Sequence, residues 1–259
     1  MDYDIIFILT IIAMIAGFID SIAGGGGLIT LPALLLSGVN PVSAIATNKL
    51  QASAATFSAT IAFARKGLID WKRATPIAIM SFLGGIIGAI SISFIPKYIL
   101  QISVPILLIF VVLYFLFSPK LDKEERKAKI TYSSFALLVA PILGFYDGVF
   151  GPGVGSFFIV SFILLMGFNL INAMSYTKLS NVACNLGSLS VFLHQGEIIF
   201  SIAISMALGA SIGAQLGTKF AVRYGTKIIK PLLIIISSIM AVKLLTEPSN
   251  PIYLYITTM

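Results

Sequence analysis

A ten-residue segment that occurs twice constrains this chain most: residues 17–26 read GFIDSIAGGG, and residues 144–153 read GFYDGVFGPG. Five of the ten positions are identical at an offset of 127 residues (144 minus 17). Each copy places a carboxylate and a glycine cluster inside a long apolar stretch, where a charge and a weak helix former are both costly. In membrane proteins with many spans, paired helix breaks at corresponding places in two halves point to a transport site.

The apolar content of the chain excludes a soluble globular fold. Hydrophobic residues make up 58% of the sequence and charged residues 10%, and the mean hydropathy is +1.03. These values are typical of a polytopic membrane protein, so we predict an all-α fold of membrane-spanning helices. The apolar runs cover residues 4–23, 28–37, 41–64, 74–95, 98–117, 131–150, 154–167, 170–193, 198–218 and 228–246.

Two of these runs are too short to cross a bilayer as helices. Runs 28–37 and 154–167 both follow a glycine cluster, and they would rise only about 15 and 21 Å. The hydrocarbon core is about 30 Å thick. We therefore predict half-helices or steeply broken spans after both clusters.

The two halves are predicted to be inverted relative to each other. Beyond the glycine clusters they match at an offset of 129, which pairs Lys49 with Lys178 (178 minus 49). Each half holds five apolar runs, and an odd number makes the second half enter the membrane upside down. Loop 65–73 carries four basic residues, whereas the matching loop 194–199 contains no Lys or Arg. Basic loops gather on one side of the membrane only if the halves are inverted.

A charged segment that begins at Pro119 separates the halves. We predict an N-terminal transmembrane repeat at 1–118, a cytoplasmic linker at 119–130 and a C-terminal transmembrane repeat at 131–259. Both termini then lie outside. The acidic start of the chain lacks the basic flank of a secretory signal, so we expect the first run to be retained as a helix.

Lys49 and Lys178 lie within apolar runs at equivalent positions. An intramembrane Lys costs about 2.5–3.5 kcal/mol on insertion scales, so each calls for a partner or a ligand. One interpretation is that the lysines snorkel to the interface or pair with Asp20 and Asp147. The other is that both ammonium groups and nearby half-helix N-termini converge on an anion. Asn181, three residues after Lys178, favours a polar cavity.

Asp20 and Asp147 each precede a glycine cluster by four residues. Three roles are open to them: accepting protons in a coupling cycle, holding the lysines, and capping the broken backbone. We favour the last two. Gly25, Gly26 and Gly153 would let the backbone break and expose amide donors to a ligand.

Composition also limits cofactors and partners. Cys184 and His194 are the single cysteine and histidine, so we predict no disulfide framework, no metal site and no cofactor. The cations lie in short loops beside apolar runs, which indicates membrane topology and not nucleic-acid binding. The expected partners are a small anionic substrate and the lipid bilayer. Glycines spaced by four at 84 and 88, and again at 213 and 217, predict helix-packing surfaces, with a homodimer face as the alternative.

The motifs resemble one known family. Residues 17–20 and 23–27, followed by 47–51 and by 177–181, are similar to the TauE/SafE family of sulfite exporters, and the similarity extends over residues 4–246. This resemblance implies a prokaryotic plasma-membrane transporter of sulfite, sulfoacetate or related organosulfonates and small oxyanions. The second copy departs from the first, because Pro152 replaces a glycine and Thr177 replaces Asn48.

We therefore predict a secondary transporter, and not an enzyme, that binds a small sulfur-containing anion near the membrane midplane between the repeats and moves it by alternating access. Asp20 and Asp147 are the predicted coupling or structural carboxylates. The alternatives are an anion channel, a transporter of another small oxyanion or carboxylate, and an intramembrane enzyme with the two aspartates as a dyad. The predicted substrate-binding residues are Asn48, Lys49, Gln51, Thr177, Lys178, Asn181, Gly25, Gly26 and Gly153.

Overall fold

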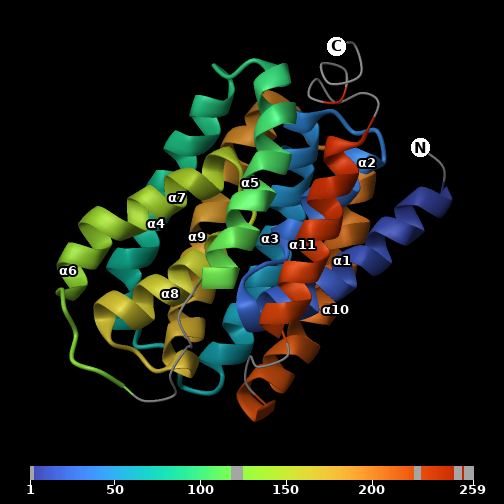
Figure 1. Ribbon diagram of the computed structural model, residues 1–259. Coiled ribbons are helices and arrows are strands. Elements are labelled where there is room, and N and C mark those ends of the chain that lie inside the picture. The colour runs from blue at the N-terminus through green and yellow to red at the C-terminus, as the bar shows by residue number, and fades with distance from the viewer. Residues whose placement is uncertain (1–2, 118–124, 225–228, 248–252, 254–259) are drawn as a thin grey trace.

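The computed structural model describes residues 3–117, 125–224, 229–247 and 253. These described residues fold as helices without strands, which confirms the predicted all-α fold (Figure 1). Residues 118–124 of the predicted linker and the two chain ends lie outside the described part. The first half contains α1 (Tyr3–Ala23), α2 (Gly27–Leu36), α3 (Pro41–Ala64), α4 (Trp71–Ile92) and α5 (Lys97–Phe117). The second contains α6 (Tyr132–Ser134), η1 (Phe135–Val139), α7 (Ala140–Val149), α8 (Val154–Met166), α9 (Leu170–Gln195), α10 (Phe200–Tyr224) and α11 (Ile229–Leu245).

Helix lengths separate spanning segments from short ones. Four stretches are long and apolar enough to cross a membrane: Tyr3–Ala23, Trp71–Ile92, Tyr132–Val149 and Phe200–Ala221. The protein is therefore membrane-integral. α2 has 10 residues and α8 has 13, so they rise about 15 and 20 Å, less than the hydrocarbon core of about 30 Å. They are the short helices predicted after the glycine clusters.

The main packing contacts join helices of the first half to helices of the second. α1 packs against α10, and α4 packs against α7. α1 and α7 belong to the first apolar run of their halves, and α10 and α4 belong to the fourth. Each pair therefore joins the first run of one half to the fourth run of the other, and Figure 1 shows the two pairs on opposite sides of the bundle. α3 and α9 pack against each other between them, and α5 lies beside α11.

Glycines allow the outer pairs to approach closely. A Cβ at Gly84 would overlap the carbonyl oxygen of Pro141, and a Cβ at Gly213 would overlap that of Met14. The two contacts are equivalent, because 213 minus 84 is 129 and 141 minus 14 is 127. The predicted glycine surfaces therefore pack within the chain, where small residues let helix backbones come together.

The run 131–150 is less regular than its counterpart α1. It begins with α6, continues through the π-helical turn η1, and becomes α-helical again at Ala140. Pro141 follows directly and has no N–H to donate to the preceding turn. A π-turn, which shifts the backbone hydrogen bonds by one residue, accommodates such an interruption.

Both glycine clusters break the backbone as predicted. α1 ends at Ala23 and α2 begins at Gly27, while α7 ends at Val149 and α8 begins at Val154. Gly24 has a φ of 75° and Gly151 a φ of 93°. This left-handed region is costly for residues that carry a Cβ, which explains why each break contains glycine.

Candidate functional site

Lys49, nine residues into α3, reaches across to the break of the second half. Its Nζ lies 2.8 Å from Asp147 Oδ2 and donates a hydrogen bond to the main-chain carbonyl of Asp147. The two side chains are 1% and 2% exposed. A charge buried this deeply requires an opposite charge and hydrogen bonds, and the carbonyls of a helix's last turn attract cations. The pair therefore holds α3 against the end of α7.

Lys178 of α9 makes the equivalent contacts with the first half. Its Nζ donates to Asp20 Oδ2 at 2.7 Å and also to the main-chain carbonyl of Asp20, in the last turn of α1. The Lys178 side chain is fully buried, whereas that of Asp20 is 13% exposed. Both lysines thus pair with aspartates, as one of the two sequence interpretations proposed, and each pair crosses from one half to the other.

Further hydrogen bonds brace the first break. Asp20 Oδ1 accepts a hydrogen bond from the backbone N–H of Gly26 at 3.0 Å. The hydroxyl of Thr30 donates to Asn48 Oδ1 at 2.6 Å, which ties α2 to α3. The carboxylate of Asp20 therefore has two roles, since it neutralises Lys178 and caps the broken backbone.

The two breaks also touch each other. A Cβ at Gly24 would overlap the backbone of Gly155 at the start of α8. The hydroxyl of Ser156 donates to the carbonyl of Ala23, the last residue of α1. The breaks of the two halves therefore meet in the interior of the bundle.

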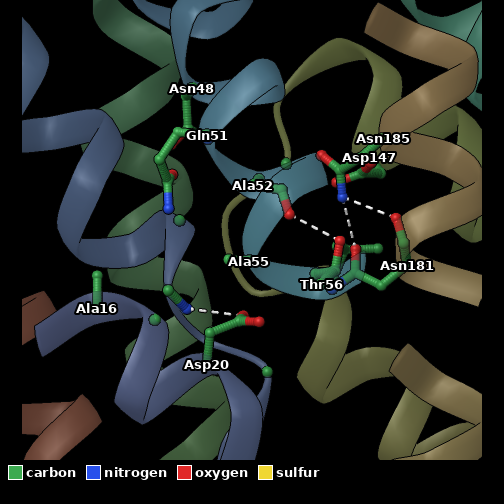
Figure 2. Close-up of a pocket in the computed structure, with 16 residues that line it drawn as sticks. Ala16, Asp20, Asn48, Gln51, Ala52, Ala55, Thr56, Asp147, Asn181 and Asn185 are labelled. Atoms are coloured by element: carbon green, nitrogen blue, oxygen red, sulfur yellow. Dashed lines mark hydrogen bonds between the residues drawn. The ribbon is translucent and has the colours of Figure 1, made fainter. Parts of the chain in front are cut away.

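A small cavity lies between the breaks, α3 and α9. Its volume is about 30 Å³, which is room for about two water molecules. Figure 2 shows Gln51 extending from α3 toward the break that carries Asp20, with Asn181 and Asn185 across the cavity. Small residues such as Ala16, Ala52 and Ala55 form part of the wall. Carboxylates and amides supply the polar groups.

Several amide donors of this cavity have no partner. Asn185 Nδ2 donates to Asn181 Oδ1 at 2.9 Å, but the NH₂ groups of Asn48, Gln51 and Asn181 donate no hydrogen bond to any residue that the structure describes. These three side chains are only 3%, 4% and 4% exposed. The fully buried side-chain atoms without a hydrogen-bond partner among the described residues are Asp147 Oδ2, which is ion-paired, and Thr177 Oγ1. The three amide groups belong to residues that line the cavity, where water or ligand oxygens can accept their hydrogen bonds.

The structure brings most of the predicted site residues to this cavity. Asn48, Gln51, Asn181, Gly26, Asp20 and Asp147 line it. Lys49 and Lys178 are not among the lining residues and stand behind the aspartates that neutralise them. Gly25, Gly153 and Thr177 do not line it either. Thr177 Oγ1 is buried and has no hydrogen-bond partner among the described residues.

Sequence reasoning missed two residues that position the site, Thr30 and Ser156. Both bind the breaks through their hydroxyls, and both lie in the short apolar helices just after the glycine clusters. A hydroxyl residue in the first turn of each short helix is the sequence pattern from which these two contacts could have been predicted. The alanines of the cavity wall are a second such pattern. Ala52 and Ala55, one and four positions after Gln51, are small and leave room beside its side chain.

A buried polar cavity between two helix breaks in a bundle of membrane-spanning helices is an arrangement typical of membrane transporters. Comparison with known proteins agrees with this interpretation as a membrane transporter. The family model described as "Sulfite exporter TauE/SafE" matches residues 9–244, and the chain belongs to this family.

Similar proteins carry the name of probable membrane transporter proteins. The chain is 42% identical to "Probable membrane transporter protein ORF9" of Sinorhizobium sp., covering 98% of this chain and 97% of that one. It is 42% identical to "Probable membrane transporter protein YfcA" of Escherichia coli K12, over 93% and 89% of the two chains. A "Probable membrane transporter protein" of Haemophilus influenzae is 43% identical, over 94% and 96%. No solved structure matches the chain. The family and these names describe membrane transporters and not enzymes, as the sequence predicted.

Proposed function

We propose that this protein is a secondary transporter in a prokaryotic plasma membrane that carries small sulfur-containing anions such as sulfite, sulfoacetate or related organosulfonates. The substrate binds in the cavity between the two breaks and crosses by alternating access. The description of the family supports a sulfur oxyanion as cargo. The chemistry of the cavity supports an anion independently of that description.

The unused amide donors of Asn48, Gln51 and Asn181 carry this proposal. They come from α3 and α9 and face one cavity. Sulfonate and sulfite groups present three oxygens that only accept hydrogen bonds, so a ring of N–H donors fits them. Binding such a ligand would give each of these donors an acceptor, and one neutral hydrogen bond contributes about 0.5–1.5 kcal/mol.

The charges around the cavity define how an anion could enter. The charges of Lys49 and Lys178 are balanced by those of their partners Asp147 and Asp20, so the four side chains together carry no net charge. An anion that approached the aspartates without a cation would be repelled in a medium of low dielectric constant. We therefore infer that substrate binding draws one lysine away from its aspartate, so that the ammonium group faces the anion. In this way the lysines form the cationic part of the loaded site.

Alternating access requires the closed cavity to widen, because about 30 Å³ holds about two water molecules and not a sulfonate. The glycine breaks supply backbone joints on both sides of the cavity. Matched ion pairs and matched glycine contacts at offsets of 127 and 129 support two inverted repeats. A movement that opens one side would then have an equivalent that opens the other.

Cysteine labelling tests the inverted topology. Asp70 caps the start of α4, and Gln195 bonds to Ser93 just after its end. In a Cys184→Ser background, Asp70→Cys should react from the cytoplasmic side and Gln195→Cys from the outside. Labelling of both positions from one side would refute the inverted arrangement.

Replacement of Gln51 tests the binding site. Gln51→Ala should weaken sulfonate binding by about two- to tenfold, the value of one neutral hydrogen bond, without loss of stability. Gln215→Ala is the matched control, because Gln215 Nε2 donates to the Ser58 carbonyl at 2.8 Å and neither residue lines the cavity. It should lower stability and leave binding unchanged. Equal affinity of Gln51→Ala and the parent for every sulfonate would exclude this cavity as the binding site.

Ligand-dependent thermal stabilisation identifies the substrate class. A ligand present at 100 times its Kd adds about 2.7 kcal/mol to the free energy of unfolding. Sulfite and sulfonates should stabilise the purified protein more than sulfate or carboxylates do. Counterflow of labelled substrate in proteoliposomes separates a carrier from a channel, since only a carrier exchanges substrate through an occluded state.

A further inference from the structure

A second cavity, of about 520 Å³, opens on the outer surface where α3, α4 and α9 meet. Its lining is almost wholly apolar. The hydroxyl of Thr60, one of the lining residues, is already used, because it donates to the Thr56 carbonyl at 2.7 Å. The residues that define the groove are Phe57, Arg65, Trp71, Ile79, Phe82 and Leu186.

The length of the groove along α4 corresponds to the thickness of one leaflet of a bilayer. Along α4 its wall extends from Trp71 to Phe82, a separation of eleven positions that corresponds to a rise of about 16 Å. Half of the hydrocarbon core measures about 15 Å. Phe57 is 56% exposed and Ile79 is 54% exposed, so these walls face the lipid.

A cation stands at one end of this groove. Arg65 immediately follows the end of α3, is exposed, and has no ion pair or side-chain hydrogen bond within the described part of the chain. Arg73 in the same loop region is already engaged, because its Nε lies 3.4 Å from Asp70 Oδ2 and its guanidinium stacks over Tyr132. Trp71 lines the same groove as Arg65, and tryptophan is enriched at the depth of lipid head groups.

The equivalent position in the second half lacks these features. At an offset of 129, Arg65 corresponds to His194 and Trp71 to Phe200. Gln215, whose counterpart is Ile86, bridges α10 to Ser58 of α3 with hydrogen bonds of 2.8 and 2.9 Å. The arginine and the tryptophan of the groove are therefore specific to the first half and are not a general consequence of the repeat.

We propose that this groove binds one anionic phospholipid of the leaflet that faces Arg65. An acyl chain lies between α3, α4 and α9, and the phosphate pairs with the guanidinium of Arg65. The planar fork of an arginine binds two phosphate oxygens at once. Basic residues beside membrane helices attract anionic lipids, and here the groove adds a fixed place for the acyl chain.

Lipid titration of the delipidated, purified protein tests this proposal by native mass spectrometry. Dioleoyl phosphatidylglycerol should bind at least about fivefold more tightly than dioleoyl phosphatidylcholine, the effect of one cation near the surface. Arg65→Gln should remove this preference. Lys66→Gln is the matched control, because it removes the same charge from the adjacent residue, which does not line the groove, and it should keep most of the preference.

A second variant tests the acyl-chain site separately from the charge. Ala183 lies in the wall contributed by α9, and Ala183→Phe should reduce the binding of both lipids. Arg65→Lys should retain part of the preference for phosphatidylglycerol. Equal binding of the two lipids by the parent protein would show that no cation selects the head group. Equal losses in Arg65→Gln and Lys66→Gln would show general surface attraction. Either result would overturn the proposal.

Discussion

The two buried ion pairs have the same residue types and equivalent positions, but their carboxylates are bonded differently. Both oxygens of Asp20 accept hydrogen bonds, one from Lys178 and one from the Gly26 N–H. Asp147 Oδ2 lies 2.8 Å from the Lys49 ammonium, which also donates to the Asp147 main-chain carbonyl. Unlike Asp20, the Asp147 carboxylate accepts no hydrogen bond from a backbone N–H among the described residues. Asp20 therefore forms part of the backbone break, while Asp147 holds its lysine mainly by charge.

This difference assigns different tasks to the two halves. Moving the Asp20 carboxylate would also release the N–H of Gly26 and loosen the first break. The second break has its own brace, a hydrogen bond of 2.6 Å from the Tyr146 hydroxyl to the Pro152 carbonyl. Asp147 can therefore part from Lys49 without disturbing that bond. We expect the Lys49–Asp147 pair to be the one that opens first when an anion enters.

The largest expected effect comes from breaking one pair on one side. Lys49→Met leaves the Asp147 carboxylate buried without a counter-charge, which should lower the free energy of unfolding by about 3–5 kcal/mol. Asp147→Asn should recover much of this loss in the double variant. A double-mutant cycle from denaturant titrations in detergent measures the coupling.

The crossed arrangement provides the control for this cycle. Lys49→Met combined with Asp20→Asn changes the same residue types, but both lie in the first half and they do not pair with each other. Their effects should add. Strong coupling of Lys49 to Asp20, and none to Asp147, would mean that the pairs form within the halves.

The next largest effect is the loss of substrate affinity when a lysine is replaced. Removing either ammonium group should weaken sulfonate binding by about ten- to a hundredfold, the value of a hydrogen bond to a charged group of about 1.5–3 kcal/mol. Lys49→Met is measured together with Asp147→Asn, so that no buried charge is left alone. Arg should substitute poorly, because its planar fork needs more room than a compact ammonium group.

The aspartates are expected to behave differently from the lysines. Asp20→Asn and Asp147→Asn leave the lysine available to the anion, so folding or transport rate should suffer more than affinity. Calorimetric titration and uptake into proteoliposomes measure the two properties separately. Well-folded aspartate variants that no longer bind, or lysine variants that bind as tightly as the parent, would reverse the proposed roles.

The sequence predicted the breaks but not how they are joined. Glycines within apolar runs are local signals, and the short helices α2 and α8 follow from them. The pairing of Lys49 with Asp147 links residues 98 positions apart, and sequence alone left snorkelling, pairing and anion binding as alternatives. Whether a lysine or its partner lines a cavity depends on the rotation of α3 and α9. That rotation is set by packing contacts such as Gly85 against the Cys184 carbonyl, which no local pattern encodes.

The smallest effect concerns the brace of the second break. Tyr146→Phe removes the hydroxyl that bonds to Pro152 and should lower the free energy of unfolding by about 0.5–1.5 kcal/mol, the net value of one hydrogen bond. Tyr146 does not line the cavity, so anion affinity should stay unchanged. Tyr132→Phe is the control, because its hydroxyl bonds to Arg73 at an exposed site, where water replaces the lost partner. If Tyr146→Phe is as stable as Tyr132→Phe, the second break is not held by this bond.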